Sequence, residues 1–383
     1  MKNFFNAIGM ADMEKVHSAM IAWILDDEND KNKPGNSTSD VKTSNFTTLS
    51  ITERSKLLCK MFGVTPEGRF DSIRTTLEWN DIDILIETKM NGKTEAWVIE
   101  NKLKSQEHKS RDKDDNEIWQ TEKYKNLIDN KFGKNNSHYI LLSLGGDEAK
   151  TNGWTSLTYK RLSDLLQKYP ENSIIDEYVK AITLMTNELD KFLSETTDYS
   201  KYPNVFIKLK KSEKPGAQLE EEEKYIVENG LETIFQKQLL SKLKIKLNLD
   251  DANETFYIEE WNGSATFGFI PFKDWGEIDE SLKLQVEFQN GTFKVVLISS
   301  DVQKYREADK DDMSKIYNKR KDVFVKAEKK PWKFQPSKND AKPRVSLTKR
   351  WGGNKKWYTQ LDKFNDKYNE AVQKAIEIYN IIK

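Results

Sequence analysis

The stretch that most constrains the fold of this chain runs from residue 79 to residue 104 and reads WNDIDILIETKMNGKTEAWVIENKLK. Two runs that are typical of β-strands flank Asn91 and Gly92, and Asn-Gly between such runs is the strongest short signal for a β-hairpin. A two-residue turn at Asn91 and Gly92 also fixes the register of the strands. Counting outward from it gives the opposed pairs Met90–Lys93, Ile86–Trp97, Ile84–Ile99 and Asp83–Glu100.

Side chains alternate along a strand, so this hairpin is predicted to have one apolar and one charged face. The apolar face is expected to carry Ile82, Ile84, Ile86, Trp97 and Ile99. The charged face is expected to carry Asp83, Glu100 and Lys102. Opposed residues have Cβ atoms roughly 5 Å apart, so two carboxylates repel each other unless a cation neutralises them or one holds a proton. Aspartate opposite Glu-x-Lys is therefore a compact arrangement for a hard metal ion and an attacking water.

The alternative is that these charges form the solvated face of a sheet, an interpretation that remains open for Asp81, Glu87 and Lys89. Against it, residues 96–99 form an apolar run, which is typical of a strand covered on both faces. Charged groups near the end of a buried strand need a partner. We therefore favour a functional site at Asp83 and its neighbours.

A helix predicted over residues 11–25 carries further candidates. Glu14, His17 and Ser18 fall at positions i, i+3 and i+4, so they are expected to share one helix face. Alone, His17 would be a surface or core-edge histidine and Glu14 a solvated charge. Their coincidence with the hairpin carboxylates favours a functional role.

A second candidate pair lies after the hairpin. Residues 105–117 are almost wholly polar and predict a flexible connection, and residues 119–132 predict a helix on which Gln120 and Tyr124 can reach the same point. Residues 138–144 then predict a buried strand. A strand, crossover helix and strand in this order imply that this strand pairs in parallel with the one that carries Glu100. A short strand at 154–158 and helices at 161–166 and 174–193 are predicted to follow.

These ordered motifs resemble the signature of the PD-(D/E)XK nuclease superfamily and its RecB-like branch. The residues that carry the resemblance are Asp83, Glu100-Asn101-Lys102 and Gln120-x-x-x-Tyr124. The segment Glu14-x-x-His17-Ser18 is similar to the first helix of a bacterial subfamily. The resemblance covers roughly the first half of the chain. One departure is Ile82, which stands where the superfamily motif has proline.

The resemblance implies a restriction-endonuclease-like α/β core with a mixed central sheet flanked by helices. It also implies an endo- or exonuclease that hydrolyses phosphodiester bonds with Mg²⁺, for which Mn²⁺ can substitute. The expected metal ligands are Asp83, Glu100, the main-chain carbonyl of Asn101 and Glu14. The expected substrate is nucleic acid, with DNA favoured over RNA.

The same resemblance implies roles for the remaining candidates. Lys102 is expected to position the attacking water or stabilise charge that develops at the phosphate. Gln120 and Tyr124 are expected to orient the substrate or Lys102, and His17 is expected to position its neighbours. Two alternatives stay open: a non-catalytic nucleic-acid-binding or assembly protein on a nuclease scaffold, and a nuclease that serves inside a larger bacterial defence or DNA repair complex.

Length and composition set the frame for these expectations. The 383 residues allow two domains, predicted as a nuclease-like domain at 1–195, a connection at 196–217 and an α+β accessory domain at 218–383. In the last of these, a long helix is predicted over 218–247, and period-two runs between residues 254 and 299 predict strands with a turn at Asn290-Gly291. Basic and aromatic residues interleave over 319–357, which suits either nucleic acid or a basic surface over an aromatic core.

The charge balance and the cysteine count bear on the expected partners and on the expected compartment of the protein. Lys plus Arg and Asp plus Glu both number 62, so a tail-driven nucleic-acid binder is not expected, although a locally basic cleft is compatible. Cys59 is the single cysteine, which excludes disulfides within one chain and favours a reducing cytoplasm. No stretch approaches the length of a membrane span. The oligomeric state is left open, with a homodimer among the possibilities.

Overall fold

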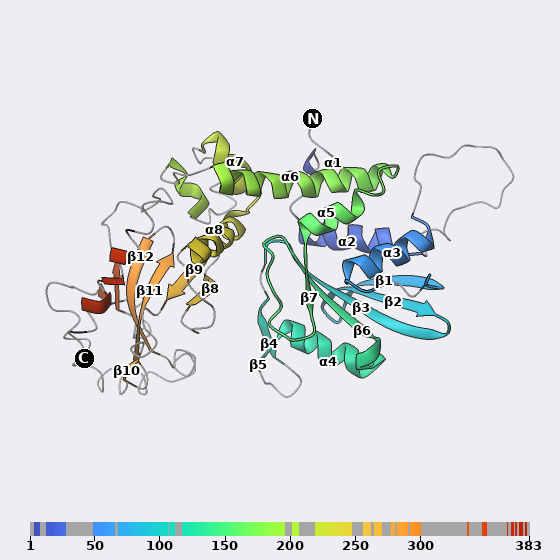
Figure 1. Cartoon of the computed structure of the whole chain (residues 1–383), viewed down its shortest axis with the longest axis horizontal. Helices are drawn as coiled ribbons and strands as arrows, with labels where there is room; N and C mark the ends of the chain where they lie inside the picture. The colour runs from blue at the N-terminus through green and yellow to red at the C-terminus, as the bar shows by residue number, and fades with distance from the viewer. Residues whose placement is uncertain are drawn as a thin grey trace. The chain divides into compact units, whose positions relative to one another are not determined.

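The computed structural model describes residues 4–7, 13–27, 49–65, 68–105, 107–111, 117–195, 201–206, 219–246, 256–261, 264–269, 277–279, 282–289, 292–299, 335–336 and 347–350, with several residues between 366 and 380. The chain divides into two compact units, Met1–Asp190 and Lys191–Lys383, each with its own sheet (Figure 1). In these described ranges, no helix combines the length and the apolar character that crossing a membrane requires.

The first unit is an α/β unit with a five-stranded sheet and a small separate ribbon. The strands of the sheet are β1 (Ser72–Trp79), β2 (Ile82–Met90), β3 (Lys93–Lys102), β6 (Ser137–Ser143) and β7 (Thr155–Thr158). The ribbon pairs β4 (Lys109–Arg111) with β5 (Glu117–Trp119). The helices are α1 (Phe4–Ala7), α2 (Glu14–Leu25), α3 (Ile51–Met61), α4 (Gln120–Phe132), the 3-10 helix η2 (Lys134–Asn136), α5 (Tyr159–Leu166) and α6 (Ser173–Glu195), which continues past the end of the unit.

The β2–β3 hairpin has the predicted register. Ile84 lies opposite Ile99 and Met90 lies opposite Lys93, which leaves a two-residue turn. Both turn residues have positive φ, 51° at Asn91 and 77° at Gly92. That backbone conformation is what a type I′ turn requires, and Asn-Gly adopts it at the lowest steric cost.

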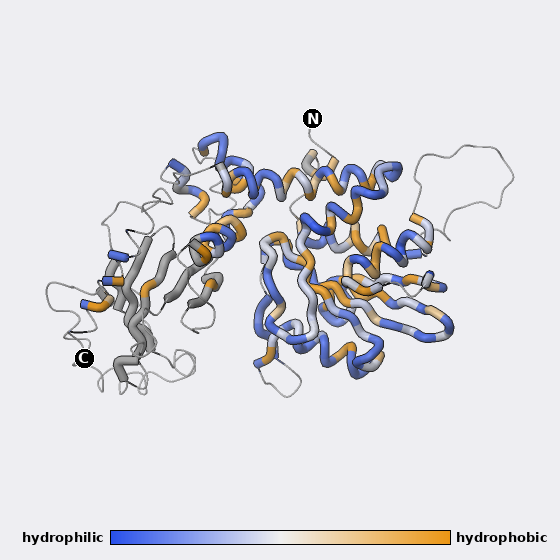
Figure 2. The backbone as a smooth tube through the Cα atoms, in the orientation of Figure 1, coloured by the Kyte–Doolittle hydropathy of each residue, from blue (hydrophilic) through white to orange (hydrophobic). Residues whose placement is uncertain are grey.

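The sheet is mixed, as predicted, with the order β1-β2-β3-β6-β7. The pairs β1–β2 and β2–β3 are antiparallel, whereas β3–β6 and β6–β7 are parallel. Helix α4 makes the crossover between β3 and β6 and covers one face of the sheet, and α2, α3 and α5 lie on the other face (Figure 1). Apolar residues are concentrated in the central strands between these helical layers (Figure 2).

Because β3 lies between two layers, its side chains alternate between two packed environments. Val98 packs with Tyr124 of α4 in one apolar cluster. Trp97 points to the other layer, where its ring meets Phe62 and stacks on His138 with 3.9 Å between ring centroids. The two residues on either side of Asn101 therefore share a face, and Asn101 itself belongs to the opposite face.

One prediction about the hairpin faces was wrong. Ile82 was expected with Ile84 and Ile86, but it lies in the cluster of Leu85 and Val98 on the α4 side. Ile82 is the first residue after a tight turn in which Asn80 and Asp81 have positive φ. The β2–β3 pairing reaches only to Ile84, so the register counted from the Asn91-Gly92 turn does not extend to Ile82.

A connecting segment also differs from prediction. The stretch at 105–117 was predicted to be a flexible connection, but its described residues include β4 and the start of β5, paired with Lys109 opposite Trp119. Trp119 consequently ends a strand and precedes α4 instead of opening the helix.

Strand β1 was not predicted, because its sequence SIRTTLEW is mostly polar and only Ile73 is fully buried.

In the second unit, the helix predicted over 218–247 is two helices, α7 (Glu221–Glu228) and α8 (Glu232–Lys246). Gly230 between them has φ of 64°, a conformation that ends a helix. The described strands form one sheet in the order β13-β14-β12-β11-β9-β8, with β10 paired to β11. They are β8 (Phe256–Trp261), β9 (Ser264–Phe269), β10 (Glu277–Asp279), β11 (Leu282–Gln289), β12 (Thr292–Ser299), β13 (Gln335–Pro336) and β14 (Leu347–Arg350), and η4 (Pro203–Phe206) is a 3-10 helix.

The strands predicted between 254 and 299 are present, and Gln289 lies opposite Thr292 around the predicted turn. Most of the basic and aromatic stretch at 319–357 lies outside the described residues, so its two interpretations remain as they were.

Candidate active site

The open end of the β2–β3 hairpin carries the predicted carboxylates. Asp83 lies on β2 and Glu100 on β3, one step beyond the paired residues Ile84 and Ile99. The main-chain N–H of Asn101 donates a hydrogen bond to Oδ2 of Asp83 at 2.7 Å. This bond holds the Asp83 side chain against β3, which is the strand that provides the second carboxylate.

Glu100 and Lys102 form a buried ion pair at this end of β3. The Nζ atom of Lys102 lies 2.6 Å from Oε1 of Glu100, and the two side chains are only 7% and 1% exposed. The other carboxylate oxygen, Oε2 of Glu100, is buried and accepts no hydrogen bond from the residues that the structure describes. An acceptor that is buried without a donor costs free energy, so this oxygen is available to a further ligand.

Both carboxyl groups hold their protons more tightly than usual. Burial raises the pKa of Asp83 to about 6, although the hydrogen bond from Asn101 and the charge of Lys102 oppose the rise. Burial and the charge of Asp83 raise the pKa of Glu100 to about 8, and Lys102 only partly offsets this. The two carboxylates therefore repel each other in a place that water does not screen, which is the situation that a bound cation relieves.

Helix α2 brings Glu14 to the same place. The charge of Glu14 contributes to the raised pKa of both Asp83 and Glu100. Its carboxylate is held by Ser105, just beyond β3, whose hydroxyl lies 2.9 Å from Oε1 and 3.2 Å from Oε2 of Glu14. The segment that follows β3 thus fixes the side chain that α2 contributes.

The other two residues of the α2 motif have different neighbours. Ser18 lies against Asn101, with 3.0 Å between its Oγ and Nδ2 of Asn101. His17 is buried, and its Nδ1 lies 3.0 Å from the hydroxyl of Tyr178 on α6. The ring of His17 also meets the edge of Tyr159. The motif therefore connects the carboxylate region to α5 and α6 rather than presenting three side chains to one point.

Helix α4 places Gln120 and Tyr124 on the face of the sheet that carries Glu100. Nε2 of Gln120 donates to the Tyr124 hydroxyl at 2.7 Å, and that hydroxyl donates to the main-chain oxygen of Asp81 at 2.6 Å. Burial and the charge of Glu100 raise the pKa of Tyr124 well above its usual value, so it stays a neutral donor. Oε1 of Gln120 is buried and accepts no hydrogen bond from the described residues.

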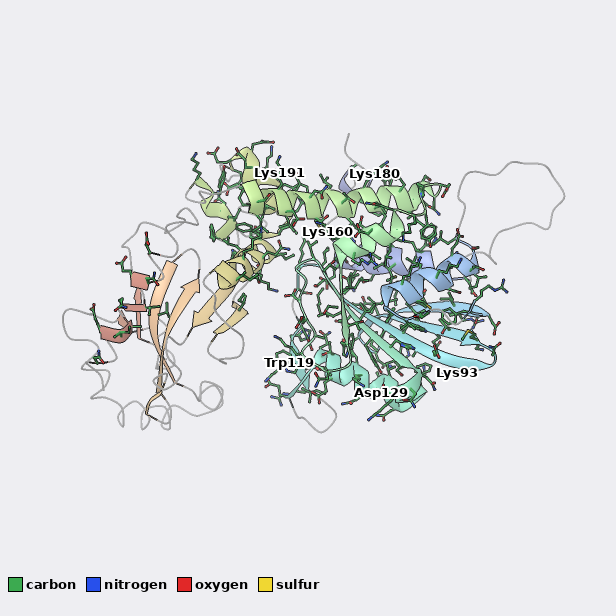
Figure 3. All side chains as sticks on the ribbon, in the orientation of Figure 1. Lys93, Trp119, Asp129, Lys160, Lys180 and Lys191 are labelled. Carbon is green, nitrogen blue, oxygen red and sulfur yellow. The ribbon has the colours of Figure 1, made fainter. Side chains whose placement is uncertain are left out.

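The first turn of α4 is held in place by Glu107. Its carboxylate accepts hydrogen bonds from the main-chain N–H and the hydroxyl of Thr121, and from the main-chain N–H of Lys150 at 2.8 Å. Glu107 therefore joins the segment after β3, the start of α4 and the loop after β6. In Figure 3 this end of α4, marked by Trp119, lies away from the hairpin tip marked by Lys93.

The donor set fits a hard divalent cation. Within the described ranges, no group of three or more His, Cys, Asp and Glu side chains lies close enough together to hold a metal ion. The fit rests on the carboxylate pair, on the buried Oε2 of Glu100 that accepts no hydrogen bond from the described residues, and on burial, which together with neighbouring negative charge raises both pKa values. Mg²⁺ is commonly held by one or two carboxylates, with water and phosphate oxygens completing its shell.

A mixed sheet with two acidic residues at the open end of a hairpin and a lysine two residues later defines a restriction-endonuclease-like fold. The model of the PD-(D/E)XK nuclease superfamily matches residues 2–195, and the chain belongs to this superfamily. Searches among curated proteins and among solved structures gave no match.

Sequence reasoning did not find Ser105, Glu107 or Tyr159. Ser105 and Tyr159 each contact a predicted site residue that lies far away in the chain, at separations of 91 residues for Ser105–Glu14 and 58 for Tyr159–Asn101. Glu107 instead contacts Thr121 and Lys150, which lie 14 and 43 residues away. Local periodicity carries no information about such pairs. Ser105 and Glu107 also fall in the segment that was predicted to be a flexible connection.

Proposed function

We propose that this protein is a divalent-metal-dependent nuclease that hydrolyses phosphodiester bonds of nucleic acid, with DNA as the favoured substrate. The observation that supports it most strongly is the pair Asp83 and Glu100 on adjacent strands, where Glu100 and Lys102 are buried and Asp83 is half-buried. A fold gains no stability from two carboxyl groups in such a place. Membership of a nuclease superfamily agrees with this proposal.

In this proposal Asp83, Glu100 and the main-chain carbonyl of Asn101 hold a Mg²⁺ or Mn²⁺ ion, and Glu14 acts as a further ligand. When bound, such an ion supplies positive charge that polarises the phosphate and lowers the pKa of water at the site. The two carboxylates suit such an ion, because a cation that replaces the proton lowers the raised pKa of Glu100 again.

Lys102 contributes a fixed ammonium group beside the scissile phosphate. In hydrolysis the water oxygen adds to phosphorus, the bond from phosphorus to the leaving oxygen breaks, and the leaving oxygen takes a proton. Lys102 positions the attacking water or stabilises the negative charge that grows on the phosphate oxygens. Its burial strengthens this interaction, because little water screens it.

The remaining residues position these groups. Tyr124 and Gln120 form a hydrogen-bonded pair anchored on the main chain of Asp81. Oε1 of Gln120 accepts no hydrogen bond from the part of the chain that the structure describes, and it is suited to orient Lys102 or the substrate. His17 acts at a distance, through Tyr178 and Tyr159.

The test is a cleavage assay on covalently closed plasmid, linear duplex, single-stranded DNA and RNA, with Mg²⁺, Mn²⁺ or a chelator. We expect cleavage only with a divalent ion, and Asp83→Asn should abolish it, because a carboxamide carries no negative charge for the cation. Asp81→Asn is the matched control, since Asp81 lies two residues away with a side chain that is 79% exposed. Cutting of closed circular plasmid would identify an endonuclease.

Two results would contradict the proposal. One is full cleavage by purified Asp83→Asn, which would place any hydrolysis elsewhere in the chain. The other is tight nucleic-acid binding without cleavage under any divalent ion, which would favour a binding or assembly protein on a nuclease scaffold.

A further inference from the structure

Asn101, the middle residue of the Glu-Asn-Lys motif, points its side chain away from the carboxylates. Neighbours along a strand face opposite sides of the sheet, so Glu100 and Lys102 face the α4 layer and Asn101 faces α2 and α5. The Asn101 side chain is fully buried. A buried carboxamide at this place needs a partner for each of its polar atoms.

The structure satisfies the Asn101 carboxamide completely. Nδ2 donates to the main-chain oxygen of Glu14 at 3.0 Å and to Oγ of Ser18 at 3.0 Å. Oδ1 accepts from the hydroxyl of Tyr159 at 2.7 Å. All the partners come from helices on one face of the sheet, α2 and the first residue of α5.

The chemistry of the partners allows only this orientation of the carboxamide. The main-chain oxygen of Glu14 can only accept, so the Asn101 atom that faces it is the nitrogen. The hydroxyl of Ser18 also points to that oxygen, at 3.3 Å, which leaves its own oxygen to accept from Asn101. Tyr159 then meets the carboxamide oxygen as a donor, and burial raises its pKa well above the usual value, so the donor proton is retained.

This network ends at a residue of the proposed site. Glu14 is the first residue of α2, and its main-chain oxygen is the point that Asn101 and Ser18 both bind. Its carboxylate is bound by Ser105. Glu14 is therefore held at its main chain by the residue between Glu100 and Lys102, and at its side chain by the residue that lies three positions after Lys102.

We infer that Asn101, Ser18 and Tyr159 form a positioning unit that locks the first turn of α2 onto the catalytic strand and so sets the place of the Glu14 carboxylate. The inference rests on the proposed nuclease function for its effect on activity. Tyr159 and Ser18 touch neither substrate nor metal in this account and act only through Asn101 and Glu14. This inference also assigns a role to Ser18 of the α2 motif, which accepts a hydrogen bond from the Asn101 side chain.

The test compares two Tyr→Phe variants that each remove one buried hydroxyl. Tyr159→Phe leaves the ring against His17 but removes the donor to Asn101. Tyr139→Phe is the matched control, since the Tyr139 hydroxyl bonds Asp129 of α4 and has no part in this unit. Ser18→Ala removes the acceptor at the other end of the network and serves as a second variant.

We expect Tyr159→Phe and Ser18→Ala to lower kcat between about 10-fold and 100-fold while KM for nucleic acid stays the same. Tyr139→Phe should leave kcat unchanged even if it lowers the melting temperature to a similar degree. Hydrogen exchange of a peptide covering residues 13–25, measured without metal or nucleic acid, should be faster in Tyr159→Phe than in wild type and in Tyr139→Phe.

A double variant decides whether the effect passes through Glu14. If Glu14→Gln already lowers kcat, adding Tyr159→Phe should cause little further loss, because the residue that the unit positions is gone. Three results would each overturn the inference. The first is a double variant whose loss in kcat is the product of the two single losses. The second is a Glu14→Gln variant with the kcat of wild type, and the third is a Tyr159→Phe variant that behaves like Tyr139→Phe in both assays. If wild type cleaves nothing with any divalent ion, the proposed function fails, and the hydrogen exchange of 13–25 still decides whether Tyr159 locks α2.

Discussion

The two ends of β3 carry the same pair of residue types in opposite surroundings. At the turn end, Lys93 lies 2.9 Å from Glu95, with side-chain exposures of 57% and 18% (Figure 3). At the other end, Lys102 lies 2.6 Å from Glu100, with exposures of 7% and 1%. The first pair is a partly exposed ion pair, and Glu95 also lies 3.6 Å from Nε2 of His138. A pair at a solvent-exposed site contributes about 0–1 kcal/mol to the free energy of unfolding. The second has lost its hydration and stands beside a further carboxyl group.

The difference separates a solvated strand end from the end that carries the proposed site. Apolar residues of similar size at positions 100 and 102 would suit a buried strand at least as well as a charged pair. The chain instead keeps charge where burial raises the pKa of Glu100 to about 8. The buried end therefore carries a cost in stability, which the cation and the chemistry proposed above would account for.

The largest difference between the ends should be in catalysis. We expect Lys102→Ala to lower kcat by roughly 10²- to 10³-fold, because a preorganised charge near the phosphate is lost. Binding of Mn²⁺ should stay or become tighter, since a nearby positive charge is gone. The measurements are a cleavage assay and a calorimetric Mn²⁺ titration on the same preparation.

Lys93→Ala is the matched control at the turn end of the same strand, and it should leave both kcat and Mn²⁺ affinity unchanged. Equal losses in the two variants would show that lysine at the open end has no special role. Loss of Mn²⁺ binding in Lys102→Ala would point to a structural role in holding Glu100.

A smaller difference is expected in the pH dependence of stability. A carboxyl group whose pKa is raised on folding stabilises the native state while protonated, and that contribution is lost as pH rises through the folded pKa. With pKa values raised from 3.8 to about 6 for Asp83 and from 4.5 to about 8 for Glu100, the metal-free protein should lose stability between about pH 4 and pH 8. Glu100→Gln should remove most of the decline above pH 6.

Urea unfolding at several pH values, with a chelator present, measures this effect. Glu95→Gln is the control, and because Glu100 stays intact its unfolding free energy should still fall between pH 5 and pH 8, with a smaller change from loss of the Glu95–His138 contact. Mg²⁺ should stabilise wild type more at pH 8 than at pH 5. A wild-type curve that rises from pH 5 to pH 8 and coincides with that of Glu100→Gln would contradict the assigned electrostatics.

The hairpin that carries the site was predictable because its register is a local property. Asn91 and Gly92 fix the turn, and the turn fixes which residues face each other for as long as the ladder stays regular. The prediction failed at Ile82, where a second tight turn interrupts the alternation. The same Asn-Gly signal at residues 229 and 230 was overlooked inside a charged helical pattern, and there it separates α7 from α8.

What holds the site together was not predictable from patterns of this kind. Strand β1 is an edge strand in which most residues are polar and Leu77 is 41% exposed, so its sequence shows neither a period of two nor an apolar run. The bonds from Asn101 to α2 and α5 join residues that are 83, 87 and 58 positions apart. Such contacts depend on how the helices pack on the sheet, which is set by the whole core.

The measurement that tests the central claim most directly is calorimetric titration of Mn²⁺ into wild type, Glu100→Gln and Glu95→Gln at pH 8, without nucleic acid. The claim is that Asp83 and Glu100, at the open end of the β2–β3 hairpin, hold a divalent cation. It predicts one Mn²⁺ site in wild type and in Glu95→Gln, and loss of that site in Glu100→Gln. Unchanged Mn²⁺ binding by Glu100→Gln would contradict the claim.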